Sequence, residues 1–385
     1  MDGGSVDDTV AVAERFGAAI LRQRGTGYGA AIRTALEDVD CEYIITMDAD
    51  GSHPPVLLQY LYRARHSAEI VIASRYIPQG YADVPLWRRL LSKLLNRSFG
   101  RMLGLPVSDL SSGYRLYRRD AVRKLDLQME TFAVLQEALI KSYCEGYAIK
   151  EIPMHFASRT HSRNHAKLLR LGRDYVQTFR AMWRLRNSVD SCDYDTRAFY
   201  STIPLQRYWQ RRRYAIITRY IDGALRVLDA GCGSTQVLNG APQVVGMDPQ
   251  MRKLRFMRRP GRRLVNGSTF CLPFATGVFD VVISSQVIEH LPEDDAIFSE
   301  LVRCLAPGGR LILGTVDYGG WQWPFIEWAY GLVKPTGYVG EHITHYTRRT
   351  LFDRLARMGL TVEDHQYILR GEIIIAARKS GARAS

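Results

Sequence analysis

The sequence predicts an α/β protein with two domains. Two apolar runs, 43–47 and 225–229, each end at a turn that carries carboxylates or glycines, and such runs are typical of buried parallel strands. In open α/β sheets, ligands bind beyond the carboxyl ends of the strands, so each turn marks a candidate site. A length of 385 residues provides enough chain for two hydrophobic cores.

The segments between the two runs suggest where the domains divide. Residues 168–187 combine apolar and basic side chains in the pattern of an amphipathic helix, and residues 188–204 are polar and irregular. We therefore expect a first domain over 1–168, a basic helix with a linker over 169–206, and a second domain over 207–380.

The composition is that of a globular protein with an excess of positive charge. Its 52 basic and 39 acidic residues give a net charge of +13, which favours anionic partners such as nucleotides, nucleic acid or an acidic membrane surface. The six cysteines show no metal-ligand spacing and indicate a reduced, cytoplasmic protein. No apolar run approaches the roughly 18 residues of a spanning helix, so we expect only peripheral contact, on the inner face of a membrane.

Asp48 and Asp50 follow the first run directly, and Gly51 and Pro54 then turn the chain away. Carboxylate oxygens are hard ligands, and a Mg²⁺ or Mn²⁺ ion between them would neutralise the charge of a departing diphosphate. Asp50 is therefore a candidate catalytic residue as well as a metal ligand. The alternative is a solvated turn that holds no metal.

Five motifs that occur in order favour the metal site. They span residues 2–9, 25–31, 47–55, 72–76 and 109–115. Together they resemble the inverting family-two glycosyltransferases of GT-A fold, most of all the polyprenyl-phosphate sugar transferases of the dolichol-phosphate mannose type. The resemblance implies a nucleotide-sugar donor, GDP-mannose or a UDP-sugar, with Asp2 and Asp7 at the nucleotide and with Asp48 and Asp50 at the metal.

This resemblance is incomplete at two places. The family opens with a strand that ends in a Pro-x-Tyr-Asn-Glu-like segment, and nothing here matches it, so we expect a misplaced start or a truncated domain. After its last strand the family places Arg-x-x-Gly-x-Ser-Lys, whose Arg and Lys contact the diphosphate. Arg159 and Lys167 match these two in type, but the glycine is absent and the spacing is longer.

Several residues are candidates for holding an acceptor phosphate. Arg75 follows the apolar run 70–73, and its guanidinium fork suits the phosphate of an acceptor lipid. The resemblance adds Arg88 or Arg89 as ligands of a polyprenyl phosphate. Asp109 would position the acceptor, or would simply occupy a turn. Since a phosphate oxygen is already anionic, inversion requires in-line attack but no general base.

Two basic amphipathic segments bear on membrane contact. Residues 85–103 set Trp and Leu side chains against five basic ones, a pattern that suits a helix in an anionic membrane interface and also a core helix with a solvated face. Residues 168–187 allow the same interpretation. They could also grip RNA or DNA, but no recognised nucleic-acid fold accompanies them.

The second apolar run opens a glycine-rich turn that contains Gly231 and Gly233. Glycine lets the backbone approach a ligand closely. About twenty residues further on, Asp248 ends the next strand, where a carboxylate can accept both hydroxyls of a ribose. A nicotinamide-binding domain shares these features, but this turn lacks the third glycine at the spacing found in Rossmann dinucleotide-binding motifs.

Three later motifs, over 272–274, 279–291 and 305–311, favour a different cofactor. With the glycine turn they resemble the class I S-adenosylmethionine-dependent methyltransferases, whose fold is a Rossmann-like seven-stranded sheet. The resemblance implies these roles: Asp229, Gly231 and Gly233 along the methionine part, Asp248 at the ribose, Ser268 or Thr269 near the adenine, and Gln286 near the sulfonium.

The methyl acceptor is less visible. His290, His342 or His345 could take a proton from an acceptor hydroxyl, and we name His290 as the catalytic candidate. Each could equally be a cap or a core histidine. His342 and His345 do not make a metal site without a third ligand.

These observations predict a fused, bifunctional enzyme. Its first half would transfer a sugar from a nucleotide-sugar to a polyprenyl phosphate, and its second half would methylate a sugar, a lipid or a small molecule. An alternative makes residues 1–187 an inactive membrane-docking module for an active methyltransferase. Nucleic-acid methylation, a third hypothesis that we do not favour, predicts binding with a steep salt dependence.

Overall fold

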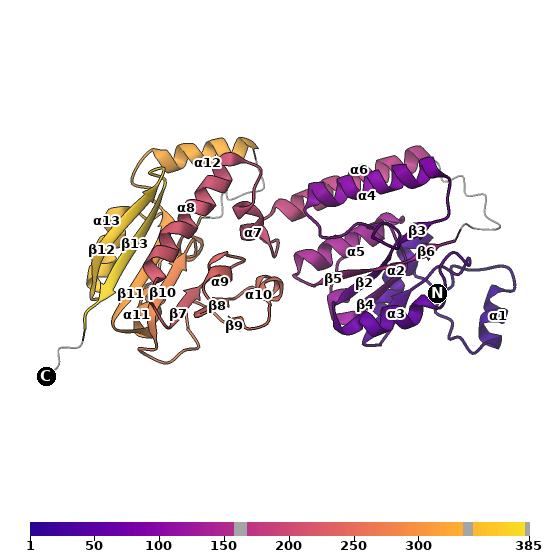
Figure 1. Ribbon diagram of the computed structural model, residues 1–385, viewed down its shortest axis with the longest axis horizontal. Helices are drawn as coiled ribbons and strands as arrows, with labels where there is room; N and C mark the ends of the chain where they lie inside the picture. The colour runs from indigo at the N-terminus through magenta and orange to yellow at the C-terminus, as the bar shows by residue number, and fades with distance from the viewer. Residues whose placement is uncertain (158–167, 334–341, 382–385) are drawn as a thin grey trace. The chain divides into compact units, whose positions relative to one another are not determined.

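The computed structural model describes residues 1–157, 168–333 and 342–381 (Figure 1). The chain divides into two compact units, Met1–Arg186 and Asn187–Ser385. Each unit has its own sheet and its own hydrophobic core, which confirms the expected α/β architecture with two domains.

A four-stranded mixed sheet forms the centre of the first unit. Its order is β1 (Tyr43–Thr46), β4 (Arg115–Arg118), β2 (Ile70–Ser74) and β5 (Ile149–Pro153). β4 runs antiparallel to β1 and β2, whereas β2 and β5 are parallel. The strand expected over 43–47 runs in the same direction as β2 and β5, but its pairing is antiparallel, because its one neighbour in the sheet is the reversed strand β4. The short strands β3 (Tyr81–Ala82) and β6 (His155–Phe156) pair separately.

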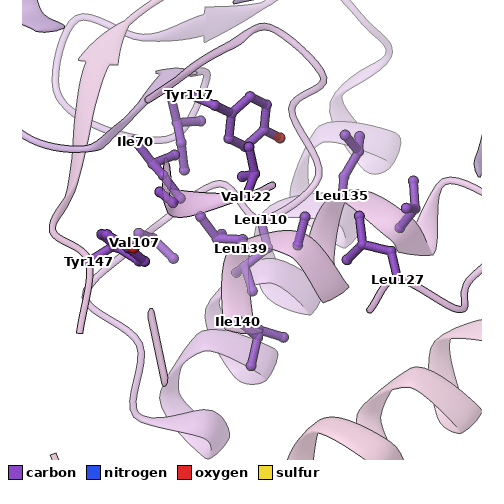
Figure 2. Close-up of a cluster of buried hydrophobic side chains, with 14 of the residues drawn as sticks. Ile70, Val107, Leu110, Tyr117, Val122, Leu127, Leu135, Leu139, Ile140 and Tyr147 are labelled. Carbon is purple, nitrogen blue, oxygen red and sulfur yellow. The ribbon is translucent and has the colours of Figure 1, made fainter. Parts of the chain in front are cut away.

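The helices of the first unit are α1 (Thr9–Arg15), α2 (Gly27–Asp38), α3 (Leu57–Arg63), α4 (Leu86–Leu103), α5 (Ala133–Cys144) and α6 (Leu168–Asn187), with 3₁₀ turns at Ala64–His66 and Arg119–Ala121. α5 is buried along most of its length. Leu135, Leu139 and Ile140 of α5 belong to the same buried cluster as Ile70 of β2 and Leu110 (Figure 2).

The end of α6 belongs to the first unit. Arg186 is fully buried, and its Nε donates to the carbonyl oxygen of Leu103 at 2.9 Å. Phe179 meets Phe99 of α4 edge to face, with 5.1 Å between ring centroids, so α4 and α6 lie side by side (Figure 1). The assignment of 169–206 as a helix with a linker is corrected here, since this part of α6 packs on the first domain.

A seven-stranded sheet forms the centre of the second unit. Its order is β12 (Leu360–Ile368), β13 (Glu372–Lys379), β11 (Leu305–Val316), β10 (Phe279–Ser285), β7 (Val227–Ala230), β8 (Val244–Asp248) and β9 (Arg263–Asn266). β13 is antiparallel to both of its neighbours, and the other pairings are parallel. The predicted seven-stranded Rossmann-like sheet is thereby confirmed.

The helices of the second unit are α7 (Tyr194–Phe199), α8 (Pro204–Ile221), α9 (Val237–Gly240), α10 (Met251–Met257), α11 (Asp295–Cys304), α12 (Gln322–Val333) and α13 (Arg348–Arg357), with a 3₁₀ turn, η3, at Ile288–His290. α7 lies within the stretch 188–204 that we expected to be a linker. Asp193, Tyr194 and Ala198 are buried there, so this stretch is a packed part of the second domain.

Candidate functional sites

The two acids of the first candidate site lie directly beyond β1, as the sequence predicts. The backbone amide of Asp48 donates to Nδ1 of His53 at 2.9 Å, and the carboxylate of Asp48 lies 3.9 Å from Nε2 of the same ring. His53 is buried and stacks on Tyr114. Asp50 is exposed, and its carboxylate accepts hydrogen bonds from the amide and hydroxyl of Ser52.

This donor set fits a hard divalent cation. Both carboxylates are at least partly accessible to solvent. Within the described residues, no third carboxylate, histidine or cysteine forms a ligand cluster with them. Mg²⁺ is commonly bound by one or two carboxylates together with substrate phosphates, so the diphosphate of a donor would complete the coordination.

Arg75 and Asp109 form a bidentate pair beside this site. Nε and Nη2 of Arg75 donate to the two carboxylate oxygens of Asp109, each at 2.8 Å. Asp109 is fully buried. Burial alone would raise the pKa of its carboxyl, but the charge and hydrogen bonds of Arg75 outweigh this and hold the pKa below its ordinary value. Arg75 as a ligand of the acceptor phosphate stays a prediction, and the two residues form one structural group.

Three residues that sequence reasoning missed support the loop 109–113. Arg115 is fully buried and donates to the carbonyl oxygens of Leu110, Ser112 and Leu135. Asn96 of α4 accepts from the amide of Leu110 at 2.8 Å. Glu151 of β5 accepts from the amides of Ser108 and Asp109. A buried arginine must satisfy its donors internally, but Arg115 opens the strand Arg-Leu-Tyr-Arg, so nothing in the sequence indicated that its side chain is buried.

The structure places the other predicted residues of the first domain as follows. Asp2 is buried and accepts hydrogen bonds from Gly4 and Ser5, whereas Asp7 is exposed and accepts one from Thr9. The guanidinium of Arg88 lies over Trp87, and that of Arg89 lies over Tyr81. Arg159 and Lys167 lie outside the described residues.

α4 presents an apolar face to solvent. Leu86, Trp87, Leu90, Leu91, Leu94 and Leu95 are between 47% and 65% exposed, whereas Asn96, Gly100 and Leu103 face the domain. Arg88, Lys93 and Arg97 are also exposed on this helix. In the described parts of the chain, no helix is long and apolar enough to cross a membrane.

A cavity of about 620 Å³ lies at the carboxyl ends of β7, β8 and β10 in the second unit. Gly231 and Gly233, which line it, both have positive φ angles, 84° and 52°. A Cβ on Gly231 would lie 2.3 Å from Cγ2 of Val287, so only glycine fits. Asp248 ends β8 at the cavity and accepts from the amides of Gly233 and Gln250, each at 2.8 Å.

Asp229 is the acid at the end of β7, and it lines the same cavity. Burial, together with the neighbouring charges of Asp248 and Asp195, raises the pKa of Asp229 to about 7. No hydrogen bond to its carboxylate is found among the described residues. A buried carboxylate that faces a cavity in this way fits the ammonium group of S-adenosylmethionine, so the site fits that cofactor.

α7 closes one side of the cavity, which sequence reasoning missed. Asp195 accepts from the amide of Ser234 at 2.9 Å, and Ser234 lies in the glycine turn. Burial raises the pKa of Asp195, but Lys253 and the hydrogen bonds of Ser234 lower it further, so that it stays below its ordinary value. The polar composition of 188–204 concealed this role.

Gln286 lies where the cofactor cavity meets a second cavity. It has a positive φ of 59°, a costly conformation for a residue with a side chain and one that is common at functional sites. Its Nε2 is buried without a hydrogen-bond partner among the described residues. The second cavity, of about 100 Å³, is mostly apolar and is lined by Trp209, Trp323 and Ile326 together with Gln286 and His342.

Ser268 is exposed on a turn and is not among the residues that line the cofactor cavity.

His290 and His342 meet beside these cavities, with 5.0 Å between ring centroids. Burial, with His290 and His345 nearby, lowers the pKa of His342 to about 4. His345 is exposed and stacks on Tyr318. Glu289, a residue that we did not single out from the sequence, joins the two histidines, and burial raises its pKa to about 7.

Family models match both halves of the chain. Residues 1–126 match the model described as glycosyl transferase family 2, and residues 228–313 match the model described as a methyltransferase domain. Both resemblances drawn from the motifs are thereby confirmed, and the chain carries two regions that belong to enzyme families.

Curated relatives align with the first half. A polyprenol monophosphomannose synthase from Mycolicibacterium smegmatis is 32% identical over 174 residues, which are 41% of this chain and 66% of that protein. An undecaprenyl-phosphate mannosyltransferase from Micrococcus luteus is 34% identical, over 35% of this chain and 57% of that protein. The chain thus spans about half to two thirds of the length of the curated relatives it matches.

Similar solved structures include methyltransferases. Magnesium protoporphyrin IX methyltransferase from Synechocystis is 20% identical with a TM-score of 0.37, covering 48% of this chain and 93% of that one. An S-adenosylmethionine-dependent methyltransferase from Mesorhizobium loti is 19% identical with a TM-score of 0.36, covering 46% and 100%.

Proposed function

Because the chain joins a glycosyl transferase family 2 region to a methyltransferase domain, we propose that it is a bifunctional transferase. The first half transfers a hexose from a nucleotide-sugar, GDP-mannose or a UDP-sugar, to a polyprenyl phosphate. The second half transfers a methyl group from S-adenosylmethionine. The observation that supports the proposal is that two separate groups of candidate residues lie at the carboxyl ends of strands, each in its own sheet.

In the first half, Asp48 and Asp50 would hold a Mg²⁺ or Mn²⁺ ion against the donor diphosphate. When bound, such an ion supplies charge neutralisation to the leaving group. The Arg75–Asp109 pair fixes the end of β2 against the loop 109–113, and Arg115, Asn96 and Glu151 hold that loop. These residues thus give the acceptor phosphate a rigid place from which in-line attack on the sugar is favoured.

The acceptor is a lipid, and α4 supplies a surface for an anionic membrane. Its exposed leucines and Trp87 would enter the interface, and Arg88, Lys93 and Arg97 would meet anionic headgroups. This docking supports a peripheral, inner-face location. Arg88 and Arg89 would then lie close to the phosphate of the polyprenyl chain.

In the second half, Asp229 would bind the ammonium group of the cofactor, and Gly231 and Gly233 would admit its methionine part. Asp248 would accept hydrogen bonds from the ribose hydroxyls. Gln286 would face the sulfonium and the acceptor, which would enter the apolar cavity beside Trp323. His290, which lines the cofactor cavity, is the candidate to take the proton of the acceptor.

A second candidate function keeps the methyltransferase and makes the first half a docking module. It is favoured by the engagement of Arg75 with Asp109, which occupies two guanidinium nitrogens of the expected phosphate ligand. Transfer of labelled hexose to a polyprenyl phosphate in vesicles, measured with Mn²⁺ and each nucleotide-sugar, decides between the two. Labelled lipid supports the bifunctional enzyme, and vesicle binding without transfer supports the docking module.

A further inference from the structure

We propose that Glu289, His290 and His342 form a binding site for a divalent transition-metal ion in the second domain. This site is separate from the one that Asp48 and Asp50 form in the first domain. The inference deepens the methyltransferase half of the proposed function and rests on it for the role of the ion, but binding of the ion can be measured by itself.

The backbone holds the three side chains together. Glu289 and His290 lie on η3, directly after β10. The amides of Ile343 and Thr344 both donate to the carbonyl oxygen of Glu289, at 2.8 and 3.1 Å. These bonds join the segment that begins at His342 to η3. The backbone of the domain therefore holds the three side chains close to one another.

The distances suit a metal. One ligand atom from each of the three residues lies within 4.8 Å of the other two. Ligands arranged tetrahedrally around an ion, each about 2.1 Å from it, are about 3.4 Å apart. Shifts of the three side chains by less than about 1 Å each therefore suffice to bring the ligand atoms into such a coordination shell.

The carboxylate of Glu289 supplies an independent argument. Its side chain is fully buried. The hydroxyl of Thr315 is near enough to lower the pKa of the carboxyl, but neither this hydroxyl nor either carboxylate oxygen has a partner with hydrogen-bond geometry among the described residues. A buried carboxylate is costly unless it is paired or coordinates a metal. Since an oxygen of this carboxylate lies within 4.8 Å of a ring nitrogen of each histidine, coordination of an ion would give the buried group a partner.

Outer partners orient the ligands. The hydroxyl of Tyr318 lies 2.8 Å from Nδ1 of His342, and a carboxylate oxygen of Glu327 lies 3.8 Å from the same atom. Metal-binding histidines commonly have such a partner on the ring nitrogen that does not bind the ion. Two histidines and one carboxylate suit Zn²⁺, Mn²⁺, Fe²⁺ or Co²⁺ better than Mg²⁺ or Ca²⁺.

The place of the site indicates its use. His290 lines the cofactor cavity, His342 lines the apolar cavity, and Gln286 lines both. An ion between the two histidines would lie beside the acceptor and could polarise one of its oxygens as a Lewis acid. His290 would then act as a ligand and not as a general base.

Co²⁺ is the probe for the test, since its visible absorption reports the ligands around it. The full chain with Asp48→Asn and Asp50→Asn is stripped of metal with a chelator and titrated with Co²⁺ by calorimetry and absorption. We expect one strong site per chain. Adding Glu289→Gln or His342→Ala should weaken Co²⁺ binding at least about tenfold and change the spectrum, whereas His345→Ala, which removes a nearby histidine outside the cluster, should leave both unchanged.

Calorimetry with S-adenosylmethionine on the same samples separates the possible failures. If the cofactor binds but Co²⁺ does not, the metal site is refuted and the proposed function stands. Equal Co²⁺ binding in all variants would refute the site as well. If the cofactor does not bind to a folded protein, the methyltransferase proposal itself fails. Should Glu289→Gln not fold, His342→Ala and the parent protein still decide the question.

Discussion

Arg75 and Asp109 face each other in an ion pair in which two guanidinium nitrogens each lie 2.8 Å from a different carboxylate oxygen. The pair joins the end of β2 to the loop 109–113. Breaking one partner should leave the other as an uncompensated buried charge or an unsatisfied donor.

Arg75→Met should therefore destabilise the first domain by about 3–5 kcal/mol. The matched control is Arg24→Met, which breaks an exposed pair with Glu37 and Asp38 and should cost less than about 1 kcal/mol. The urea dependence of amide hydrogen exchange in β2 measures the loss of stability caused by each substitution. Because the pKa of Asp109 is lowered in the folded state, the stabilisation is present above the ordinary pKa of aspartate and is lost at more acidic pH. Equal effects of the two substitutions would contradict this account of the pair.

The raised pKa of Asp229 predicts a pH dependence of cofactor binding. Below about pH 7 the carboxyl is largely neutral, and above it the carboxylate attracts the ammonium group. Affinity for S-adenosylmethionine should rise by up to about eightfold between about pH 6 and about pH 7.5. Calorimetry across that range, with Asp229→Asn as the control, should show the slope only in the parent protein. A slope shared by both would assign it to another group.

The same raised pKa has the opposite effect on the stability of the cofactor-free protein. The folded state keeps a proton on Asp229, and also on Glu289, that the unfolded chain releases near pH 4. The unfolding free energy of the second domain should therefore fall as the pH rises from about 4 to about 7. Thermal unfolding over this range tests the prediction, and a stability that rises steadily would oppose it.

Gly231 must remain glycine for the cofactor cavity to form. Its φ is 84°, and a Cβ would lie 2.3 Å from the side chain of Val287. Gly231→Ala should cost more than the about 1–3 kcal/mol of backbone strain alone and should weaken cofactor binding at least tenfold, which is about 1.4 kcal/mol. Gly223→Ala is the matched control, because Gly223 also has a positive φ, 74°, but nothing within 4 Å of an added Cβ. The Gly223→Ala control should lower the stability of the domain but leave its affinity for S-adenosylmethionine unchanged.

The exposed face of α4 predicts membrane binding that depends on leucines. Leu90→Glu with Leu94→Glu should lower partitioning onto vesicles of anionic phospholipid at least tenfold, since each buried leucine contributes about 1.5–3 kcal/mol. Tyr60→Glu with Tyr62→Glu, on the exposed side of α3, is the control and should not change it. Unchanged sedimentation of the α4 variant would leave this face without a membrane role.

Local features of the sequence predicted much of the fold. β1, which precedes Asp48, combines an apolar run with turn residues in a few consecutive positions. The same is true of β7, which precedes Gly231. Such signals are complete within the segment itself, whereas the seven-stranded sheet was expected from the resemblance of the second half to the class I methyltransferases. The antiparallel pairing of β1 with β4 was not predicted, because a single strand does not specify its partner.

The contacts that build the sites depend on residues far apart in the chain. Arg75 and Asp109 are 34 positions apart, and each had been given a separate role. Glu289 was hidden within an apolar stretch, and only the backbone bonds to Ile343 and Thr344 bring His342 to it. α7 was missed because its buried residues Tyr194 and Ala198 lie in a polar segment without apolar periodicity.

Transfer of labelled hexose from a nucleotide-sugar to polyprenyl phosphate, by the purified chain with Mn²⁺, tests the central claim most directly. The account predicts labelled lipid with the parent protein, a loss of at least about a hundredfold with Asp48→Asn and Asp50→Asn, and full transfer with Gly231→Ala, whose site is in the other domain. A protein that binds S-adenosylmethionine but forms no lipid-linked sugar from any donor would contradict it.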